Sequence, residues 1–328
     1  MLSFLLPLLS FLAPDTPAAP VPRSRTFTFE YTAMVPPLPA GTDSVELWLP
    51  VPHSDASQQT SHLTVNTTVP YTVRTGQYGN QLLHLKVAAA QAVSLRVEMQ
   101  LEATRREHLN PYLTNPAPRK ARRAEALDPD MARWLQPDRL VPLDAKIRQW
   151  AQEVVTKAQA RTDLEKARAI YEHVVSTVTY DKTGQGWGRG DIYYACDARR
   201  GNCTDFHAVF IGYCRAVGIP ARFSIGFPLP PERGQGEIKG YHCWAEFYTP
   251  ATGWVPVDAS EAAKNPARRN YFFGAHDENR LEFTRGRDLD LSPRQHATSL
   301  NYFIYPYAEA DGKPLPGVQQ TFRFQDVK

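Results

Sequence analysis

Cysteine is scarce in this sequence, and its spacing argues against two kinds of protein. The 328 residues include four cysteines, and no two of them form a Cys-x-x-Cys pair. Four are too few for a disulfide-stapled scaffold, and structural zinc sites are normally built from paired cysteines. The cysteines must therefore fill the core or take part in chemistry. They are Cys196, Cys203, Cys214 and Cys243.

Concentrated charge and long apolar runs are also missing. The net charge of +3 is too small for a dedicated nucleic-acid-binding protein. No apolar run reaches the about 20 residues that a membrane-spanning helix needs, so we expect no stable membrane insertion. A short apolar run at residues 1–13 is followed by small residues and prolines. This pattern predicts a signal peptide over residues 1–20 and export to the periplasm or the extracellular space.

Residues 21–107 have the character of β-structure. Alternating residue types indicate half-buried strands, and turn residues around Gly76 and Gly79 separate two of these segments as in a hairpin. Several short strands with turns between them predict an all-β, sandwich-like domain. The segments with strand character are 26–31, 45–49, 71–74, 82–87 and 93–99.

Residues 143–260 mix helices with strands, after a connecting stretch over 108–142 that we expect to hold one short helix. Apolar residues recur at helical spacing in three segments, the second of which opens at a capping box, Thr162-x-x-Glu165. The fold class predicted for the chain is therefore α+β. The expected helices cover 143–158, 162–178 and 203–217, and the expected strands cover 221–227, 241–248 and 254–258.

Cys203 stands where a helix would activate it. Asn202 is a good N-cap residue, so the thiol lies at the start of the helix that Gly218 ends. Unpaired N–H groups and the helix dipole favour a thiolate there. Cys214, further along the same helix, suits a packing role instead.

A cysteine nucleophile needs a base, and the base needs a group that orients it. His242 begins one predicted strand and Asp258 ends the next, with a short turn between the strands. In a hairpin the two side chains would meet near its open end. We therefore predict that Cys203, His242 and Asp258 form a catalytic triad of nucleophile, general base and orienting carboxylate.

Four motifs resemble the transglutaminase-like superfamily. They are Gly201-Asn-Cys203-Thr-Asp-Phe-His-Ala-Val-Phe210, Arg215-Ala-Val-Gly-Ile-Pro-Ala-Arg222, His242-x-Trp244 and Gly253-Trp-Val-Pro-Val-Asp258. The resemblance implies a papain-like α+β core over 143–260, preceded by the sandwich-like domain. It also implies that residues 261–328 form a β extension of the same catalytic domain.

The chemistry that the resemblance implies is acyl transfer from an amide of a protein or peptide through a thioester. Hydrolysis is favoured over transamidation, and no cofactor or metal is expected. Trp187, in the glycine-rich loop 184–190, and Tyr180 are candidates for an oxyanion donor. Trp244 and Asn202 are candidates for the substrate cleft.

Two other functions fit parts of the sequence. A catalytically silent binding or scaffold protein of the cell envelope could use the β-rich domain to hold a partner. A metal-binding module could use Cys196, Cys203, His207 and His242, although their spacing matches no common metal motif. The oligomeric state stays open.

Overall fold

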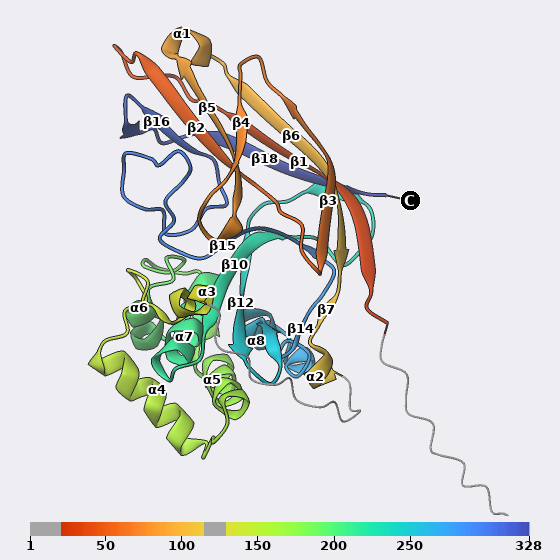
Figure 1. The fold of residues 1–328 in the computed structure, drawn as a ribbon, viewed down its shortest axis with the longest axis vertical. Helices are drawn as coiled ribbons and strands as arrows, with labels where there is room; N and C mark the ends of the chain where they lie inside the picture. The colour runs from red at the N-terminus through yellow and green to blue at the C-terminus, as the bar shows by residue number, and fades with distance from the viewer. Residues whose placement is uncertain (1–20, 115–128, 328) are drawn as a thin grey trace, which may run out of the picture.

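The computed structural model describes residues 21–114 and 129–327. The predicted signal peptide, residues 1–20, lies outside this range. A β-sandwich forms one half of the molecule, and a helical layer forms the far end of the other half (Figure 1). A four-stranded antiparallel sheet lies between them. The predicted α+β class, with an all-β N-terminal region, is confirmed.

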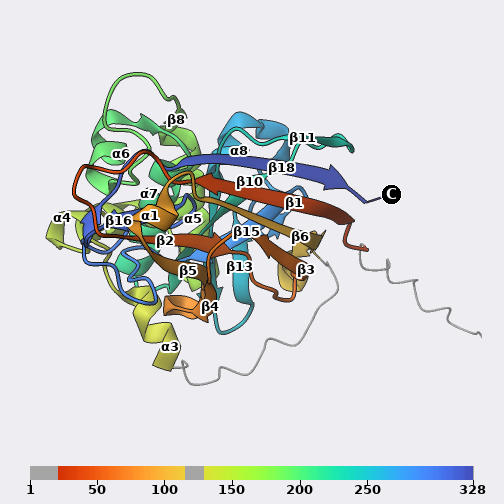
Figure 2. The same ribbon diagram turned by 90° about the horizontal axis from the view of Figure 1, so that it is seen from above.

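The sandwich consists of two five-stranded antiparallel sheets. Residues on β1 and β6 alternate between buried and more exposed positions, as expected when one face of a sheet packs on a core. The first sheet runs β11 (Gln235–Glu237), β18 (Gln319–Asp326), β1 (Ser24–Met34), β6 (Arg96–Arg106) and β3 (Gln58–Asn66). The second runs β17 (Lys313–Pro314), β16 (Tyr307–Ala310), β2 (Ser44–Val51), β5 (Gln81–Ala88) and β4 (Thr72–Thr75). Figure 2 shows the first sheet from above, with its strands side by side in this order.

The second half of the molecule packs helices against a four-stranded antiparallel sheet. The sheet runs β13 (Gly253–Val257), β12 (His242–Thr249), β10 (Ala221–Pro228) and β15 (Arg280–Arg285). The longer helices are α4 (Ala145–Lys157), α5 (Asp163–Thr177), α6 (Ile192–Ala198), α7 (Cys203–Ala216) and α8 (Ala259–Lys264). The predicted hairpin of β12 and β13 is confirmed, since Ala245 pairs with Val257 and Thr249 with Gly253.

Short elements connect these parts. Two brief strand pairs join distant segments: β7 (His108–Leu109) with β14 (Ala275–His276), and β8 (Thr179–Tyr180) with β9 (Arg200–Gly201). The described parts of 108–142 hold more helix than the one short helix expected there. The short helices are α1 (Ala89–Ala92), α2 (Pro111–Thr114), α3 (Pro129–Ala132), and the 3-10 turns Gln77–Gly79, Arg133–Leu135 and Pro266–Arg268.

The C-terminal region is divided between the two halves, which corrects the expected single extension of the catalytic domain. Strand β15 belongs to the four-stranded sheet and β14 pairs with β7, but β16, β17 and β18 complete the sandwich. Strand β18 pairs along most of β1, from Phe27 opposite Asp326 to Met34 opposite Gln319. The return of the chain gives β1 a second neighbour and so satisfies backbone groups that an edge strand would leave unpaired.

One continuous core joins the sandwich to the four-stranded sheet. Aromatic side chains from both halves meet there, with the rings of Phe227 on β10 and Phe322 on β18 centred 4.2 Å apart. Phe29 on β1 packs against Phe227 and against Phe283 on β15. The hydroxyl of Tyr31 donates to the carbonyl of Ile304 at 3.0 Å. The sandwich therefore packs against β10 and β15 of the four-stranded sheet and supports it.

Candidate active site

Cys203 is the first residue of α7, as the sequence predicted. The side chain of Asn202 accepts the backbone N–H of Thr204 at 2.9 Å, and Asp205 accepts the N–H of Asn202 at 2.9 Å, which completes a capping box. No acceptor among the described residues takes the N–H of Cys203. The thiol therefore lies at the positive end of the helix dipole, beside an unused backbone donor.

The glycine-rich loop 184–190 is fastened to the same helix. The N–H groups of Gly188 and Gly190 donate to the carboxylate of Asp205 at 2.7 and 3.0 Å. Gly201 lets this carboxylate come close, because a Cβ atom there would lie 2.3 Å from it. The loop and the start of α7 are thus held together around one buried carboxylate.

His242 and Asp258 meet at the open end of the β12–β13 hairpin. His242 begins β12, and its Nε2–H donates to Oδ2 of Asp258 at 2.7 Å. Both side chains are buried. This bond leaves Nδ1 of the imidazole free to face Cys203, whose charge helps to raise the pKa of the ring. The structure therefore brings together the three residues predicted as a triad.

The charges in this cluster favour a thiolate–imidazolium pair. Burial alone would raise the pKa of the Cys203 thiol, but hydrogen bonds with Cys243 and His242 and the histidine charge hold that pKa well below its usual range. Burial opposes protonation of His242, yet the charge and hydrogen bond of Asp258 raise its pKa to about 10. The cysteine is thus ionised and the histidine protonated over the same pH range.

Asp258 has partners that the sequence analysis missed. Arg280 on β15 donates to Oδ2 at 3.1 Å, while the hydroxyl of Ser260 and the N–H of Glu261 donate to Oδ1. Although burial raises it, the pKa of Asp258 stays well below its usual range because of His242 and Arg280. Arg280 lies 22 residues beyond Asp258 in a strand whose pairing was not predicted, so the sequence offered no spacing signal for it.

His207 is a second missed residue of the site, considered before only as a metal ligand. Its Nδ1–H donates to the carbonyl of Cys203 at 2.7 Å, and its Nε2 accepts the N–H of Ala259 at 3.2 Å. The ring is completely buried. It therefore ties the backbone of Cys203 to the residue that follows Asp258. Its position four residues after Cys203, on the same helix face, was a usable signal.

The two oxyanion candidates differ in where they lie. Tyr180 on β8 pairs with Gly201 of β9, two residues before Cys203. Burial raises the pKa of its hydroxyl, and so does the nearby charge of Cys203. Trp187 instead donates its indole N–H to the carbonyl of Gly184, within its own loop. The structure therefore places Tyr180 near Cys203, whereas the indole N–H of Trp187 is used within its own loop.

The two cleft candidates are both buried, which corrects the expectation for Trp244. Its side chain is 1% exposed and packs beneath the guanidinium of Arg280, 4.9 Å from the ring centre. It therefore supports the triad from behind and lines no open cleft. The amide of Asn202 donates to the hydroxyl of Tyr241 at 3.0 Å.

An aromatic wall beside Cys203 was not predicted. Tyr241, Tyr302 and Tyr305 pack together, and the thiolate charge acts on all three hydroxyls. The hydroxyl of Tyr302 donates to the carbonyl of Gly188 at 3.2 Å. Tyr302 and Tyr305 come from the C-terminal region, so their place depends on long-range folding.

Of the residues of the suggested metal site, Cys196 lies apart from Cys203, His207 and His242. Cys196 contacts the hydroxyl of Tyr213 at 3.5 Å, whereas both ring nitrogens of His207 are taken by backbone groups. Within the described ranges, no group of three or more histidine, cysteine or acidic side chains is arranged to hold a metal.

Among the same residues, no helix has the length and apolar character to span a membrane.

Comparisons with known proteins agree with this geometry. The profile of the Transglutaminase-like superfamily matches residues 148–259. A protein of uncharacterized function from Haemophilus influenzae is 30% identical over 325 residues, which cover 88% of this chain and 86% of its own. The uncharacterized protein YebA of Bacillus subtilis is 25% identical over 141 residues, covering 40% of this chain and 19% of its own.

A solved structure shares the whole fold. The crystal structure of a candidate cysteine protease from Cytophaga hutchinsonii matches 93% of this chain and 92% of its own, with a TM-score of 0.59 and 16% identity. The fold and the buried cysteine–histidine–aspartate cluster define the class of protein, a papain-like α+β protein with a cysteine centre. The chain belongs to the transglutaminase-like superfamily.

Proposed function

We propose that the chain is an enzyme that cleaves or transfers the acyl group of an amide in a protein or peptide, through a thioester on Cys203. The observation that carries the proposal is the buried cluster of Cys203, His242 and Asp258, in which His242 and Asp258 lie 2.7 Å apart and Cys203 is the first residue of α7. This arrangement supplies an ionised nucleophile and a proton donor in one site.

The proposed reaction begins with attack of the Cys203 thiolate on the amide carbonyl. The N–H of Cys203 and the hydroxyl of Tyr180 are the proposed donors to the oxyanion. The carbon–nitrogen bond breaks as Nδ1–H of His242 protonates the leaving amine, and the thioester remains. His242 then takes a proton from water, whose oxygen attacks the thioester, releasing the acid and the thiolate. An amine in place of water would give a new amide.

We propose that water is the acceptor and that the protein is exported. In this scheme Cys203 is the nucleophile, His242 is first the general acid and then the general base, and Asp258 is the orienting group. Arg280 and His207 are positioning residues, because they contact Asp258 and the backbone of Cys203 without reaching a substrate.

A substrate assay tests the proposal. The purified chain is incubated with denatured casein, with and without a fluorescent primary amine. New N-termini would indicate peptidase activity, ammonia release would indicate side-chain deamidation, and amine incorporation would indicate transamidation. The C203A variant is the negative control, and C214A is the matched cysteine control. Equal activity of C203A and the parent would refute the proposal.

A further inference from the structure

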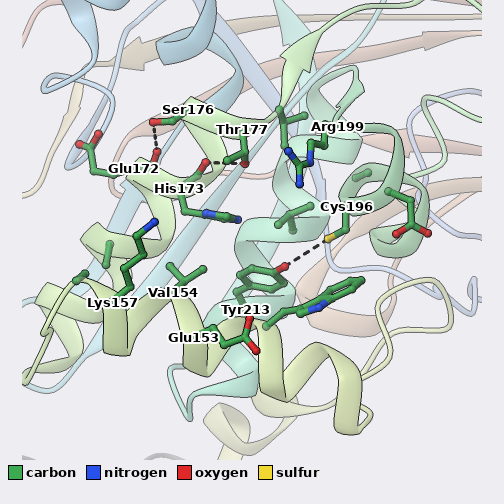
Figure 3. A pocket seen from close by; sticks show the side chains of 17 residues that line it. Glu153, Val154, Lys157, Glu172, His173, Ser176, Thr177, Cys196, Arg199 and Tyr213 are labelled. Atoms are coloured by element: carbon green, nitrogen blue, oxygen red, sulfur yellow. Dashed lines mark hydrogen bonds between the residues drawn. The ribbon is translucent and has the colours of Figure 1, made fainter.

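A cavity lies on the helical side of the molecule, away from the cluster of Cys203, His242 and Asp258. Helices α4, α5 and α6 enclose it and α7 forms its floor (Figure 3). We call it the helical groove. Its volume of about 800 Å³ lies within the range of small-molecule sites. None of Cys203, His242 and Asp258 lines it, so it is a separate site.

Apolar side chains make the floor and much of the walls of the helical groove. Val209 and the ring of Tyr213 come from α7, Val154 and Trp150 from α4, and Ala195 from α6. The ring of His173 on α5 stacks on Tyr213, with ring centres 5.9 Å apart. An apolar or aromatic body would lose contact with water on this surface.

One end of the helical groove carries positive charge. Burial lowers the pKa of His173, and the charges of Arg199 and Lys157 lower it further. Figure 3 shows these two side chains on either side of the His173 ring. Within the described residues, neither Lys157 nor Arg199 has a side-chain hydrogen bond or an ion-pair partner. Cations on the neighbouring helix α5 do, as Arg168 pairs with Glu172 and Lys166 with Asp163.

The acidic residues of the helical groove do not cancel this charge. Glu172 is already paired with Arg168 and Arg269. The carboxylate of Glu153 accepts a hydrogen bond from the side-chain amide of Gln149 at 2.8 Å. Its charge helps to raise the pKa of Tyr213, which burial raises most. Burial and the charge of Asp197 raise the pKa of Cys196, whose thiol contacts the hydroxyl of Tyr213. The cationic end is therefore open to an anion, and the apolar floor leads away from it.

We propose that the helical groove binds a small amphipathic anion, an apolar body with one carboxylate or phosphate head. The head would lie between Lys157, Arg199 and His173, and the body would lie along Val209 and Tyr213. This site is independent of the reaction proposed at Cys203, and either proposal can fail without the other.

Calorimetric titration of the purified full chain with decanoate and with decyl phosphate tests the proposal. Decanol supplies the chain without the charge, and inorganic phosphate supplies the charge without the chain. Decanoate and decyl phosphate should each bind about tenfold more tightly than decanol or inorganic phosphate. Equal binding of decanol and decanoate, or no binding of the anions, would overturn the proposal.

Variants assign the head-group contacts. K157Q and R199Q should each weaken decanoate binding about tenfold, since each removes one charge-assisted contact. Both side chains are exposed, so the fold should be retained. R148Q removes an exposed arginine from α4 outside the groove and should change nothing. Unchanged binding by both groove variants would contradict the site.

Alkylation of cysteines reports where the ligand lies. Cys196 lines the helical groove and is only partly buried, so bound decanoate should slow its alkylation. Alkylation of Cys203 should keep its rate. Protection of Cys203 in place of Cys196 would put the ligand at the catalytic cluster and reject the proposal.

Discussion

The two ends of α7 hold cysteines with opposite chemistry. Cys203 at the start and Cys214 near the end are both buried. Burial raises the pKa of Cys214 well above its usual range, since only the charge of Arg215 opposes it. At Cys203 the hydrogen bonds of Cys243 and His242 outweigh the same burial. The partners of a buried thiol, and not its depth, therefore decide whether it is ionised.

Removing the two thiols in turn gives the largest expected contrast. C203A should lose on the order of 10⁴-fold or more in turnover while remaining folded, because it deletes the proposed nucleophile. C214A should keep its turnover. Hydrolysis assays with circular dichroism as a fold control measure both effects. Comparable losses of turnover in the two variants would contradict the proposed difference between Cys203 and Cys214.

Asp258 should be the next most sensitive position. D258N removes the charge that keeps His242 protonated and leaves Arg280 without its partner, so turnover should fall by on the order of 10³-fold. Asp277 also pairs with Arg280 but does not touch His242, which makes D277N the matched control. The account fails if D277N is as inactive as D258N in steady-state assays.

His207 should have an intermediate effect through position alone. H207A frees the carbonyl of Cys203 and the N–H of Ala259, and the resulting misplacement should cost about 10²-fold in kcat. H207N keeps a donor near the Nδ1 position and should recover part of the loss. A purely structural role would lower the melting temperature of both variants without separating their kcat values.

The pH dependence of turnover should be broad. Activity needs Cys203 ionised, and a pKa well below its usual range extends ionisation toward acidic pH. It also needs His242 protonated, which a pKa of about 10 allows up to that value. The alkaline limb of the rate should therefore fall near pH 10, measured with a fluorogenic amide. An alkaline limb near the usual histidine pKa would show that Asp258 does not hold the imidazolium.

The smallest expected effect is on stability. C214A leaves a small cavity in a fully buried position and should cost about 1 kcal/mol in unfolding free energy. Urea denaturation of the variant and the parent measures this difference. No change would mean that the neighbouring side chains of α7 close the cavity.

Local signals predicted the catalytic cluster better than the boundaries of the fold. The N-cap at Asn202 and the β12–β13 hairpin depend on residues close in sequence, and both could be predicted. Arg280 and Tyr302 reach the site through long-range packing. The pairing of β18 with β1 joins opposite ends of the chain, so no local pattern could assign β18 to the sandwich. The position of His207 one helical turn after Cys203 could be read from the sequence. Because we considered it only as a metal ligand, its contacts with the backbone were not predicted.

Selective alkylation of the native protein tests the central claim most directly. The parent and H242A are treated with limiting iodoacetamide near pH 6, where an ordinary thiol is almost entirely protonated, and the modified cysteines are mapped by mass spectrometry. The account predicts fast labelling of Cys203, slow labelling of Cys214, and a marked slowing at Cys203 in H242A. Equal labelling of the two cysteines, or a Cys203 rate that H242A does not change, would contradict the thiolate–imidazolium pair.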